Sequence, residues 1–478
     1  MLIVGLLFPI LFGFIISLLI VSDIPIFERI SIAYGLGFGL LTLAMFFLDV
    51  AGIKFSLINT VILISALMIL SLTYLLLRHK ISYPSLRKLN VFKKIKQTIS
   101  SLSIFEGIII GLLIFFLLSN IAISVYWPVW EADAMGMFDF RARVFAETES
   151  ISEAARTITV ISPGYFLAYP PLASLASTWL YLCGWATPKV FYPLLLISLA
   201  IICYYSLRDY SLRYHALLFT LIIVIHPAIY FHATASYINF PFAFYFAVGI
   251  MYLYRWMSTQ KRGFLSLAGI FFALFAWTRR ESLLFFLGSL AVLIIFAISQ
   301  RRFFAPILFA LLYFSVEPLW NIYLSAKPFW IIYLKNFLYS QFSLIDTVVA
   351  SSSFIPEVSR VPGMFNRFFD FAHWRTALIW LRLWIISPHR ETFYSLFLIT
   401  LLCIDRIRKH LFLFLLVYLN LVLFTLAGYM VLMNRVLMNR ELWKGTTSSA
   451  KRLFMIFPPI MWYFMALVTA ETKDESSS

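Results

Sequence analysis

A run of charged residues directly after a long apolar stretch is the part of this sequence best suited to chemistry. Pro128 interrupts the apolar run, and five charges follow it closely: Glu131, Asp133, Asp139, Arg141 and Arg143. Five charges would be very costly to place in hydrocarbon, so we expect this segment to be a loop or surface helix just outside a membrane. A carboxylate there could accept a proton, and arginines could bind an anion.

The composition predicts a polytopic helical membrane protein. Of 478 residues, 62% are hydrophobic and 13% are charged, and the mean hydropathy is +0.90, whereas soluble domains carry about 25% charged residues. No polar stretch is long enough to form a soluble domain. We therefore expect an all-α chain with a single transmembrane domain over residues 1–478.

Apolar runs of spanning length recur from end to end, and the length criterion predicts about thirteen crossings. The first run lacks a basic start and a cleavage site of small residues, so we expect it to be a retained span. The predicted spans are 3–21, 30–50, 56–77, 105–126, 189–207, 214–231, 237–254, 264–278, 282–299, 303–323, 391–404, 410–433 and 453–470.

The charges of the connecting loops predict the orientation. Residues 78–96 contain seven Lys or Arg and no acid, which is typical of a cytoplasmic loop. Three more basic loops fit the same side: one with Arg255, Lys261 and Arg262, one with Arg301 and Arg302, and one with Arg406, Arg408 and Lys409. The segment with Asp133 then faces outside, in a first large outer loop over 128–188.

With the basic loops on the cytoplasmic side, the number of crossings between them leaves no place for two of the apolar pieces as full spans. Residues 172–185 and 376–387 are predicted to be interfacial or re-entrant helices in the outer leaflet, although full crossing of both remains the alternative. Residues 324–390 form a second outer loop in this topology. Three outer segments are then basic, against the usual bias: the turn at 278–281, residues 360–391 and residues 434–452. An anionic ligand explains this better than headgroup contacts alone.

Several function classes lack their sequence signals. Most of the net charge of +16 lies in short loops between spans, where topology requires it, so nucleic-acid binding is not expected. There is no phosphate-binding Gly-x-x-x-x-Gly-Lys-Ser/Thr stretch for ATP-driven transport. The three cysteines and seven histidines have no metal-ligand spacing. Gly35, Gly37 and Gly39 lie inside an apolar span, where we interpret them as helix-packing positions.

The segment 133–143, Asp-Ala-Met-Gly-Met-Phe-Asp-Phe-Arg-Ala-Arg, resembles the bacterial pattern D-A-W-x-x-W-x-x-K-A-K of the GT-C superfamily. These are membrane glycosyltransferases that use polyprenyl-phosphate sugars, such as protein mannosyltransferases and lipid A aminoarabinose transferases. Met and Phe stand here for the tryptophans, and Arg for the lysines. The resemblance implies that Asp133 is the acidic residue of the first large outer loop.

Four later segments resemble the same superfamily in order and spacing. Tyr169-Pro170-Pro171-Leu172 matches a Tyr-Pro-x-Leu segment, residues 237–241 match Tyr-Ala-Asp-Leu-Pro, residues 278–281 match Thr-Lys-x-Glu, and residues 448–453 match Ser-x-x-Arg-Leu. The resemblance covers roughly 105–470. Asn239 stands where the superfamily has a second acid, which puts a two-carboxylate metal site in doubt.

The resemblance and the residues together predict transfer of a sugar from a polyprenyl phosphate at the outer face of the membrane. Asp133 is the expected general base, with Glu131 as the alternative, and Arg280 and Arg452 are expected to clamp the donor phosphate. The acceptor is a lipid, glycan or protein, and a divalent cation (Mg²⁺ or Mn²⁺) is left open. The other predicted substrate-binding residues are Arg141, Arg143, Tyr169, Asn239, Arg279, Glu281 and Arg375.

Two other functions use similar residues. A transporter or flippase for a lipid-linked sugar would need the arginines but no base, and inverted repeats would favour it. A lipid-linked polysaccharide polymerase or ligase would depend on the large loop 324–375 rather than on Asp133.

Overall fold

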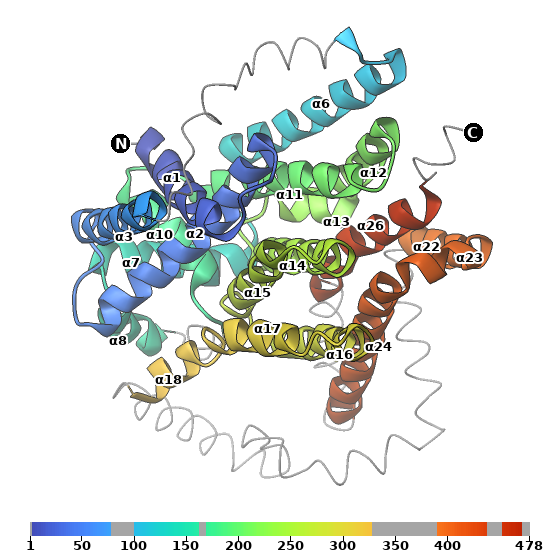
Figure 1. Cartoon of the computed structure of the whole chain (residues 1–478). Helices are drawn as coiled ribbons and strands as arrows, with labels where there is room; N and C mark the ends of the chain where they lie inside the picture. The colour runs from blue at the N-terminus through green and yellow to red at the C-terminus, as the bar shows by residue number, and fades with distance from the viewer. Residues whose placement is uncertain (1, 78–99, 162–168, 327–389, 437–451, 471–478) are drawn as a thin grey trace.

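Helix α14 (Asn239–Thr259) runs through the centre of the helix bundle (Figure 1). Every residue from its start to Met257 is buried, as expected of a helix that is apolar on all sides. Helices α11 (Phe191–Arg208), α15 (Arg262–Ala276) and α26 (Phe457–Thr469) pack directly against it. This central helix also delivers Asn239, one of the predicted site residues, to one end of the bundle.

The computed structural model describes residues 2–77, 100–161, 169–326, 390–436 and 452–470. Within these ranges every regular element is a helix, so the all-α prediction is confirmed for them. The other elements are α1 (Leu2–Ile20), α2 (Ile26–Val50), α3 (Leu57–Leu77), α6 (Ile104–Tyr126), η1 (Ala134–Asp139), α7 (Phe140–Thr148), α8 (Ile151–Ile161), α10 (Leu172–Leu182), η2 (Pro188–Val190), α12 (Arg213–Ile225), α13 (Pro227–His232), α16 (Ser282–Gln300), α17 (Phe304–Phe314), α18 (Leu319–Ala326), α22 (Arg390–Leu402), α23 (Ile404–Ile407), η6 (Arg408–His410), α24 (Leu411–Val436) and η7 (Phe454–Ile456).

Eight helical segments of the described residues are long and apolar enough to cross a membrane, which is compatible with the predicted membrane protein. Helices α12, α15, α22 and α26 are apolar but shorter, so the count of about thirteen crossings stays a prediction. The eight segments are Leu2–Ile20, Ile26–Val50, Leu57–Leu77, Ile104–Tyr126, Pro188–Arg208, Ser282–Gln300, Phe304–Ala326 and Ile404–Ala427.

Two predicted spans are interrupted in the structure. The span expected over 214–231 divides into α12 and α13 at Pro227, and the span over 303–323 divides into α17 and α18 just before and after Pro318. Proline has no N–H to donate and its ring clashes with the preceding turn, so a helix rarely passes through it unbroken.

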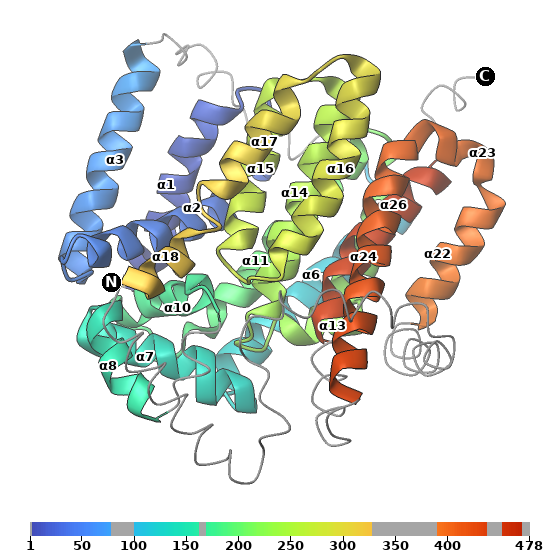
Figure 2. The ribbon, with the colours of Figure 1, turned by 90° about the horizontal axis from the view of Figure 1, so that it is seen from below.

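The bundle has two distinct ends, which Figure 2 shows at the top and the bottom. The η1 end, at the bottom, holds η1, α7, α8, α10 and α13. The Arg255 end, at the top, holds the connections from α14 to α15 and from α16 to α17, together with α23. Each end has its own ion pairs, with Asp133 and Arg452 at the first and Glu28 and Arg255 at the second.

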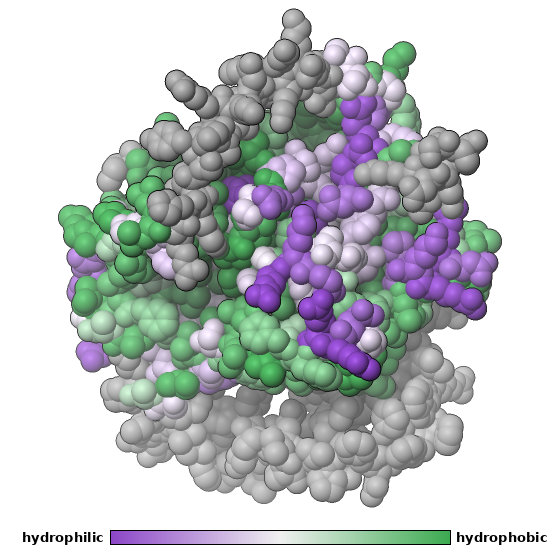
Figure 3. All heavy atoms as spheres, in the orientation of Figure 1, coloured by the Kyte–Doolittle hydropathy of each residue, from purple (hydrophilic) through white to green (hydrophobic). Residues whose placement is uncertain are grey.

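At the Arg255 end, one prediction about loop charges is wrong. Arg255 was expected in a basic loop, but it lies inside α14 and is buried. Its guanidinium forms ion pairs with Glu28 of α2 and with Asp209, the latter at 2.8 Å. Helix α14 continues five residues beyond the predicted span, to Thr259, and Arg255 is paired inside the bundle instead of lying in a loop. Figure 3 shows hydrophilic residues gathered on this face of the molecule. The exposed basic residues of this end are Lys261, Arg262, Arg301, Arg302, Arg408 and Lys409.

Helix α10 lies at the η1 end and packs against α7, η1 and α2. Its 11 residues span only about 16 Å, about half the thickness of a bilayer core. The second piece predicted to stay in the outer leaflet, 376–387, lies outside the described residues. So does most of the predicted outer loop over 324–390.

Helices α1 and α2 pack backbone to backbone near Gly37. A Cβ atom added to this glycine would lie 1.9 Å from the carbonyl oxygen of Pro9, so no other residue fits without separating the helices. The glycine-rich stretch of α2 thus serves packing, as interpreted from the sequence.

Candidate active site

The segment after α6 is held in place at the η1 end by a buried lysine. Pro128 stops α6, and the chain turns back over the bundle. The buried Lys189 of η2 donates from Nζ to the carbonyl oxygens of Trp127 and Pro128, at 3.1 and 3.2 Å. These two hydrogen bonds hold the segment that leads to Glu131 and Asp133, and no sequence pattern marks this role of Lys189.

Asp133 stands immediately before a π-helical turn, η1. Such wide turns are rare, cluster at functional sites and change the face on which successive side chains lie. Asp133, at the start of this turn, faces a pocket, while Asp139, at its end, points to α10 and accepts a 2.6 Å hydrogen bond from the Tyr181 hydroxyl. The same short segment thus provides one carboxylate for the pocket and another for packing.

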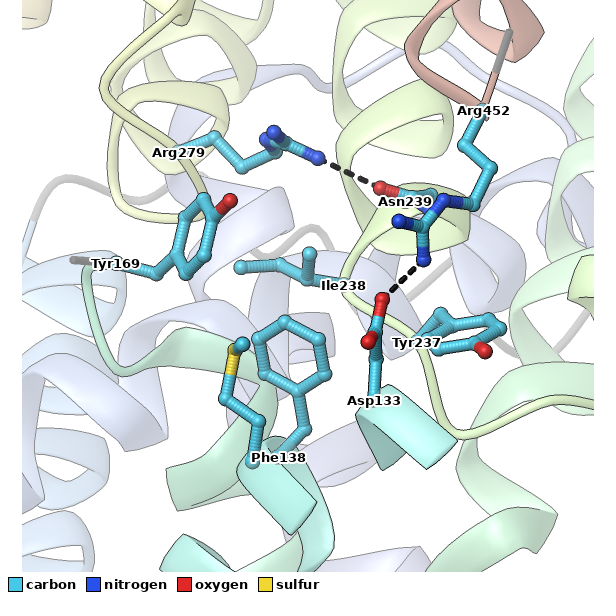
Figure 4. Close-up of a pocket in the computed structure, with 9 residues that line it drawn as sticks. Asp133, Phe138, Tyr169, Tyr237, Ile238, Asn239, Arg279 and Arg452 are labelled. Atoms are coloured by element: carbon cyan, nitrogen blue, oxygen red, sulfur yellow. Dashed lines mark hydrogen bonds and ion pairs between the residues drawn. The ribbon is translucent and has the colours of Figure 1, made fainter. Parts of the chain in front are cut away.

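Five segments that are far apart in the sequence meet around this pocket (Figure 4). They are the η1 region, the segment leading into α10, the start of α14 with the two residues before it, the turn between α15 and α16, and the segment just before η7. The pocket encloses about 340 Å³ of space, including its open mouth. Its lining residues are Asp133, Met137, Phe138, Tyr169, Tyr237, Ile238, Asn239, Arg279 and Arg452.

Asp133 and Arg452 form an ion pair across the pocket. The Arg452 guanidinium donates from Nη1 to Oδ2 of Asp133, and its carbon lies 5.7 Å from the centre of the Tyr237 ring. The side chains are 32% exposed for Arg452 and 39% for Asp133. Burial and the charge of Asp133 raise the pKa of the Tyr237 phenol, so this ring stays neutral beside the pair.

Arg279 is held much more completely on the opposite wall of the pocket. It donates from Nη1 to Oδ1 of Asn239 at 2.6 Å, and from Nε and Nη2 to the carboxylate of Glu281 at 3.2 and 2.6 Å. The ring of Tyr169 lies 4.9 Å from its guanidinium carbon. Burial lowers the pKa of Arg279, but the charge of Glu281, the nearby Tyr169 and the hydrogen bond to Glu281 together outweigh it, so the pKa is raised overall. The pocket therefore keeps a fixed positive charge.

Arg141 does not line the pocket, but it holds the backbone of a residue that does. This buried guanidinium donates to the Ser174 hydroxyl at 2.8 Å and to the carbonyls of Tyr169 and Pro170 at 2.9 and 3.3 Å. Burial lowers its pKa to about 9, so it remains charged at neutral pH. Arg141 thereby sets the position of Tyr169, the ring that lies beside Arg279.

Five of the predicted site residues meet in the pocket and the others lie elsewhere. Glu131 is buried outside the lining, Arg143 is paired with Asp139, and Glu281 touches the pocket only through Arg279. Arg280 is exposed and does not line the pocket, where its neighbour Arg279 does. Arg375 lies outside the described residues. The five that meet are Asp133, Tyr169, Asn239, Arg279 and Arg452.

Four lining residues were not predicted: Met137, Phe138, Tyr237 and Ile238. Phe138 and Ile238 belong to a small apolar cluster, separate from the main core, which forms part of the pocket wall with Met137 and the two tyrosines. Phe138 follows Asp133 by five residues, a spacing that a π-helical turn places on one face but an α-helix does not. Tyr237 and Ile238 directly precede Asn239. Their adjacency to a predicted site residue is the sequence signal that could have identified them.

The pocket's oxygen donors do not suit a divalent cation. Asp133 is the single carboxylate among the lining residues and it is paired with Arg452, while the Asn239 carbonyl oxygen accepts from Arg279. Hard cations such as Mg²⁺ need oxygen ligands that are free to bind. In the part of the chain that the structure describes, no group of three or more His, Cys, Asp or Glu residues could hold a metal ion.

No protein-family model, no curated protein and no solved structure matches this chain. The function must therefore be inferred from the residues of the site and their arrangement.

Proposed function

We propose that this protein is a membrane glycosyltransferase. It moves a sugar from a polyprenyl-phosphate donor to an acceptor, with the pocket at the η1 end as its active site. The supporting observation is that a carboxylate, Asp133, faces two arginines, Arg279 and Arg452, in one pocket built from distant segments. Sugar transfer from a lipid phosphate needs a base for the acceptor and fixed cations for the leaving phosphate.

The proposed reaction uses these groups in one displacement. The Asp133 carboxylate takes the proton of an acceptor hydroxyl, and the acceptor oxygen forms a bond to the anomeric carbon of the sugar. The bond from that carbon to the phosphate oxygen breaks, and its electron pair leaves with the phosphate. Arg279 and Arg452 stabilise the charge on the departing phosphate through charge-assisted hydrogen bonds.

The surroundings of the pocket suit a ligand with a charged head and an apolar chain. Charged and polar groups occupy one part of the wall, while Met137, Phe138 and Ile238 provide an apolar part. The bundle exposes large apolar side chains along its outer helices, for example Ile108, Leu112 and Phe115 on α6. A polyprenyl chain can lie along such a surface in the membrane, with its phosphate in the pocket.

The test is incubation of the purified protein with labelled polyprenyl-phosphate sugars and a panel of lipid, glycan and peptide acceptors. Protein-dependent labelling of an acceptor is the expected result. Movement of the labelled lipid across a liposome membrane with no labelled acceptor would favour a transporter instead. Chain extension of a lipid-linked glycan would favour a polymerase or ligase.

A further inference from the structure

The two arginines of the pocket are held in very different ways. All three guanidinium nitrogens of Arg279 donate hydrogen bonds, to Asn239 and Glu281, and the rings of Tyr169 and Phe242 lie 4.9 and 5.6 Å from its guanidinium carbon. Its side chain is only 9% exposed. Within the part of the chain that the structure describes, Arg452 donates a hydrogen bond to Asp133 and contacts the ring of Tyr237, and its side chain is 32% exposed. Arg279 is therefore fixed, and Arg452 is able to change partner.

The partner of Arg452 is the residue that the proposed reaction needs as a base. Among the described residues, Oδ2 of Asp133 accepts its hydrogen bond from Arg452 and from no other group. An oxygen that already accepts from a guanidinium has one lone pair fewer to offer to an acceptor hydroxyl. As the pocket stands in this structure, Arg452 engages one of the two oxygens of the base.

We infer that Arg452 exchanges between Asp133 and the phosphate of the donor, so that donor binding releases the base. The inference rests on the proposed function for the identity of the anion. When a phosphate enters, Arg452 turns to it and Asp133 is freed for the acceptor. Donor must then bind before acceptor, and an empty site has no active base to use water as a false acceptor.

The relative strengths of the ion pairs and hydrogen bonds in the pocket support the exchange. A partly exposed ion pair is weak because water screens it and two long side chains lose freedom. A phosphate offers a guanidinium two parallel charge-assisted hydrogen bonds, which is a better partner than the single contact to Asp133. Arg279 would have to give up two hydrogen bonds to the Glu281 carboxylate and one to the buried amide of Asn239 to make the same change, which is more costly than losing a single contact.

A double-mutant cycle on binding tests this directly. The probe is a polyprenyl phosphate without sugar, and its dissociation constant is measured for the full chain in lipid nanodiscs. The variants are Asp133→Asn, Arg452→Ala and the two combined. Because Asp133→Asn removes the competitor for Arg452, we expect about fivefold tighter binding in that variant. In the Arg452→Ala background the same change should alter binding less than about twofold, through loss of repulsion alone.

Asp139→Asn is the matched control, because Asp139 ends the same η1 turn but pairs with Arg143 outside the pocket. It should leave binding unchanged. An equal effect of Asp133→Asn in both backgrounds, or no effect in either, would overturn the exchange. So would a wild-type protein that binds neither the lipid phosphate nor inorganic phosphate, a second probe that shows whether the phosphate group suffices.

The cycle is independent of sugar transfer. Coupling between the two substitutions without labelling of any acceptor would support the exchange and contradict the proposed function. Transfer with no coupling would support the proposed function and overturn the exchange.

Discussion

The two ends of the bundle use the same kind of interaction for opposite purposes. At the Arg255 end, Arg255 and Glu28 pair with side chains that are 4% and 0% exposed, and the Tyr252 hydroxyl adds a 2.6 Å hydrogen bond to Glu28. At the η1 end, Arg452 and Asp133 pair with side chains that are 32% and 39% exposed. The first pair is enclosed by helices, and the second opens into a pocket.

This difference separates a structural ion pair from one that is available to a ligand. Removing one partner of a buried pair leaves an uncompensated charge, so the pair is effectively permanent. A partly exposed pair can be broken at little cost, and its two side chains can then bind a substrate. Substitutions at the two ends should accordingly affect different properties, folding at one and turnover at the other.

The largest effect is expected for Asp133→Asn. Loss of a general base typically slows the chemical step by roughly two to four orders of magnitude, while the protein should fold and still bind the donor lipid. Turnover of labelled polyprenyl-phosphate sugar is the measurement, with Asp139→Asn as the control that keeps at least half of wild-type turnover. Activity of Asp133→Asn within tenfold of wild type would remove this residue from the chemistry.

At the Arg255 end, Glu28→Gln should reduce stability and leave the site intact. Breaking a buried pair costs about 3–5 kcal/mol, because Arg255 then lacks its enclosed partner. Thermal unfolding in detergent and the yield of inserted protein measure this loss. The fraction that folds should bind the donor with wild-type affinity. A normal unfolding temperature combined with weak donor binding would reverse the roles of the two ends.

Next in size is Arg279→Ala, compared with its neighbour Arg280→Ala. Loss of a charge-assisted contact to phosphate should cost about 2–3 kcal/mol in donor affinity, or roughly 30- to 150-fold. Arg280 is exposed and outside the lining, so its replacement should change the affinity less than about twofold. Titration of both variants with labelled donor decides which arginine binds the phosphate. The larger loss in Arg280→Ala would restore the assignment made from the sequence.

The smallest expected effect is that of Asn239→Asp. A carboxylate at this position would compete with the donor phosphate for Arg279, which now donates to the Asn239 amide oxygen. We expect donor affinity to fall by about two- to tenfold. Binding measured with and without Mg²⁺ checks in addition whether a second carboxylate creates a cation site. Unchanged affinity would mean that Arg279 does not contact the phosphate.

The sequence predicted where most helices lie and which segments meet, but not how individual side chains point. The span predicted over 105–126 agrees with α6 within one residue, because continuous hydrophobicity defines it. The span over 237–254 ended too early because the buried partner of Arg255, Glu28, is more than two hundred residues away in the sequence. Local charge alone cannot reveal such a partner.

The pocket shows the same limit at the scale of single residues. The order of the motifs identified Asp133, Tyr169, Asn239 and Arg452, which lie at or near the ends of helices at one end of the bundle. It could not choose between Arg279 and Arg280, because adjacent residues in a turn point in different directions. It also missed the inward direction of Arg141, whose partners are backbone carbonyls that no sequence pattern marks.

Photo-crosslinking tests the central claim, that the η1 end holds the lipid phosphate, most directly. A polyprenyl phosphate with a photoreactive group in its first isoprene unit is bound to the full chain, irradiated and mapped by peptide mass spectrometry. The account predicts attachment near Asp133, Tyr169 or Tyr237. Both ends carry arginines, so the positive charge of each end could attract a phosphate. Attachment concentrated near Arg255 or Arg406 would contradict the account.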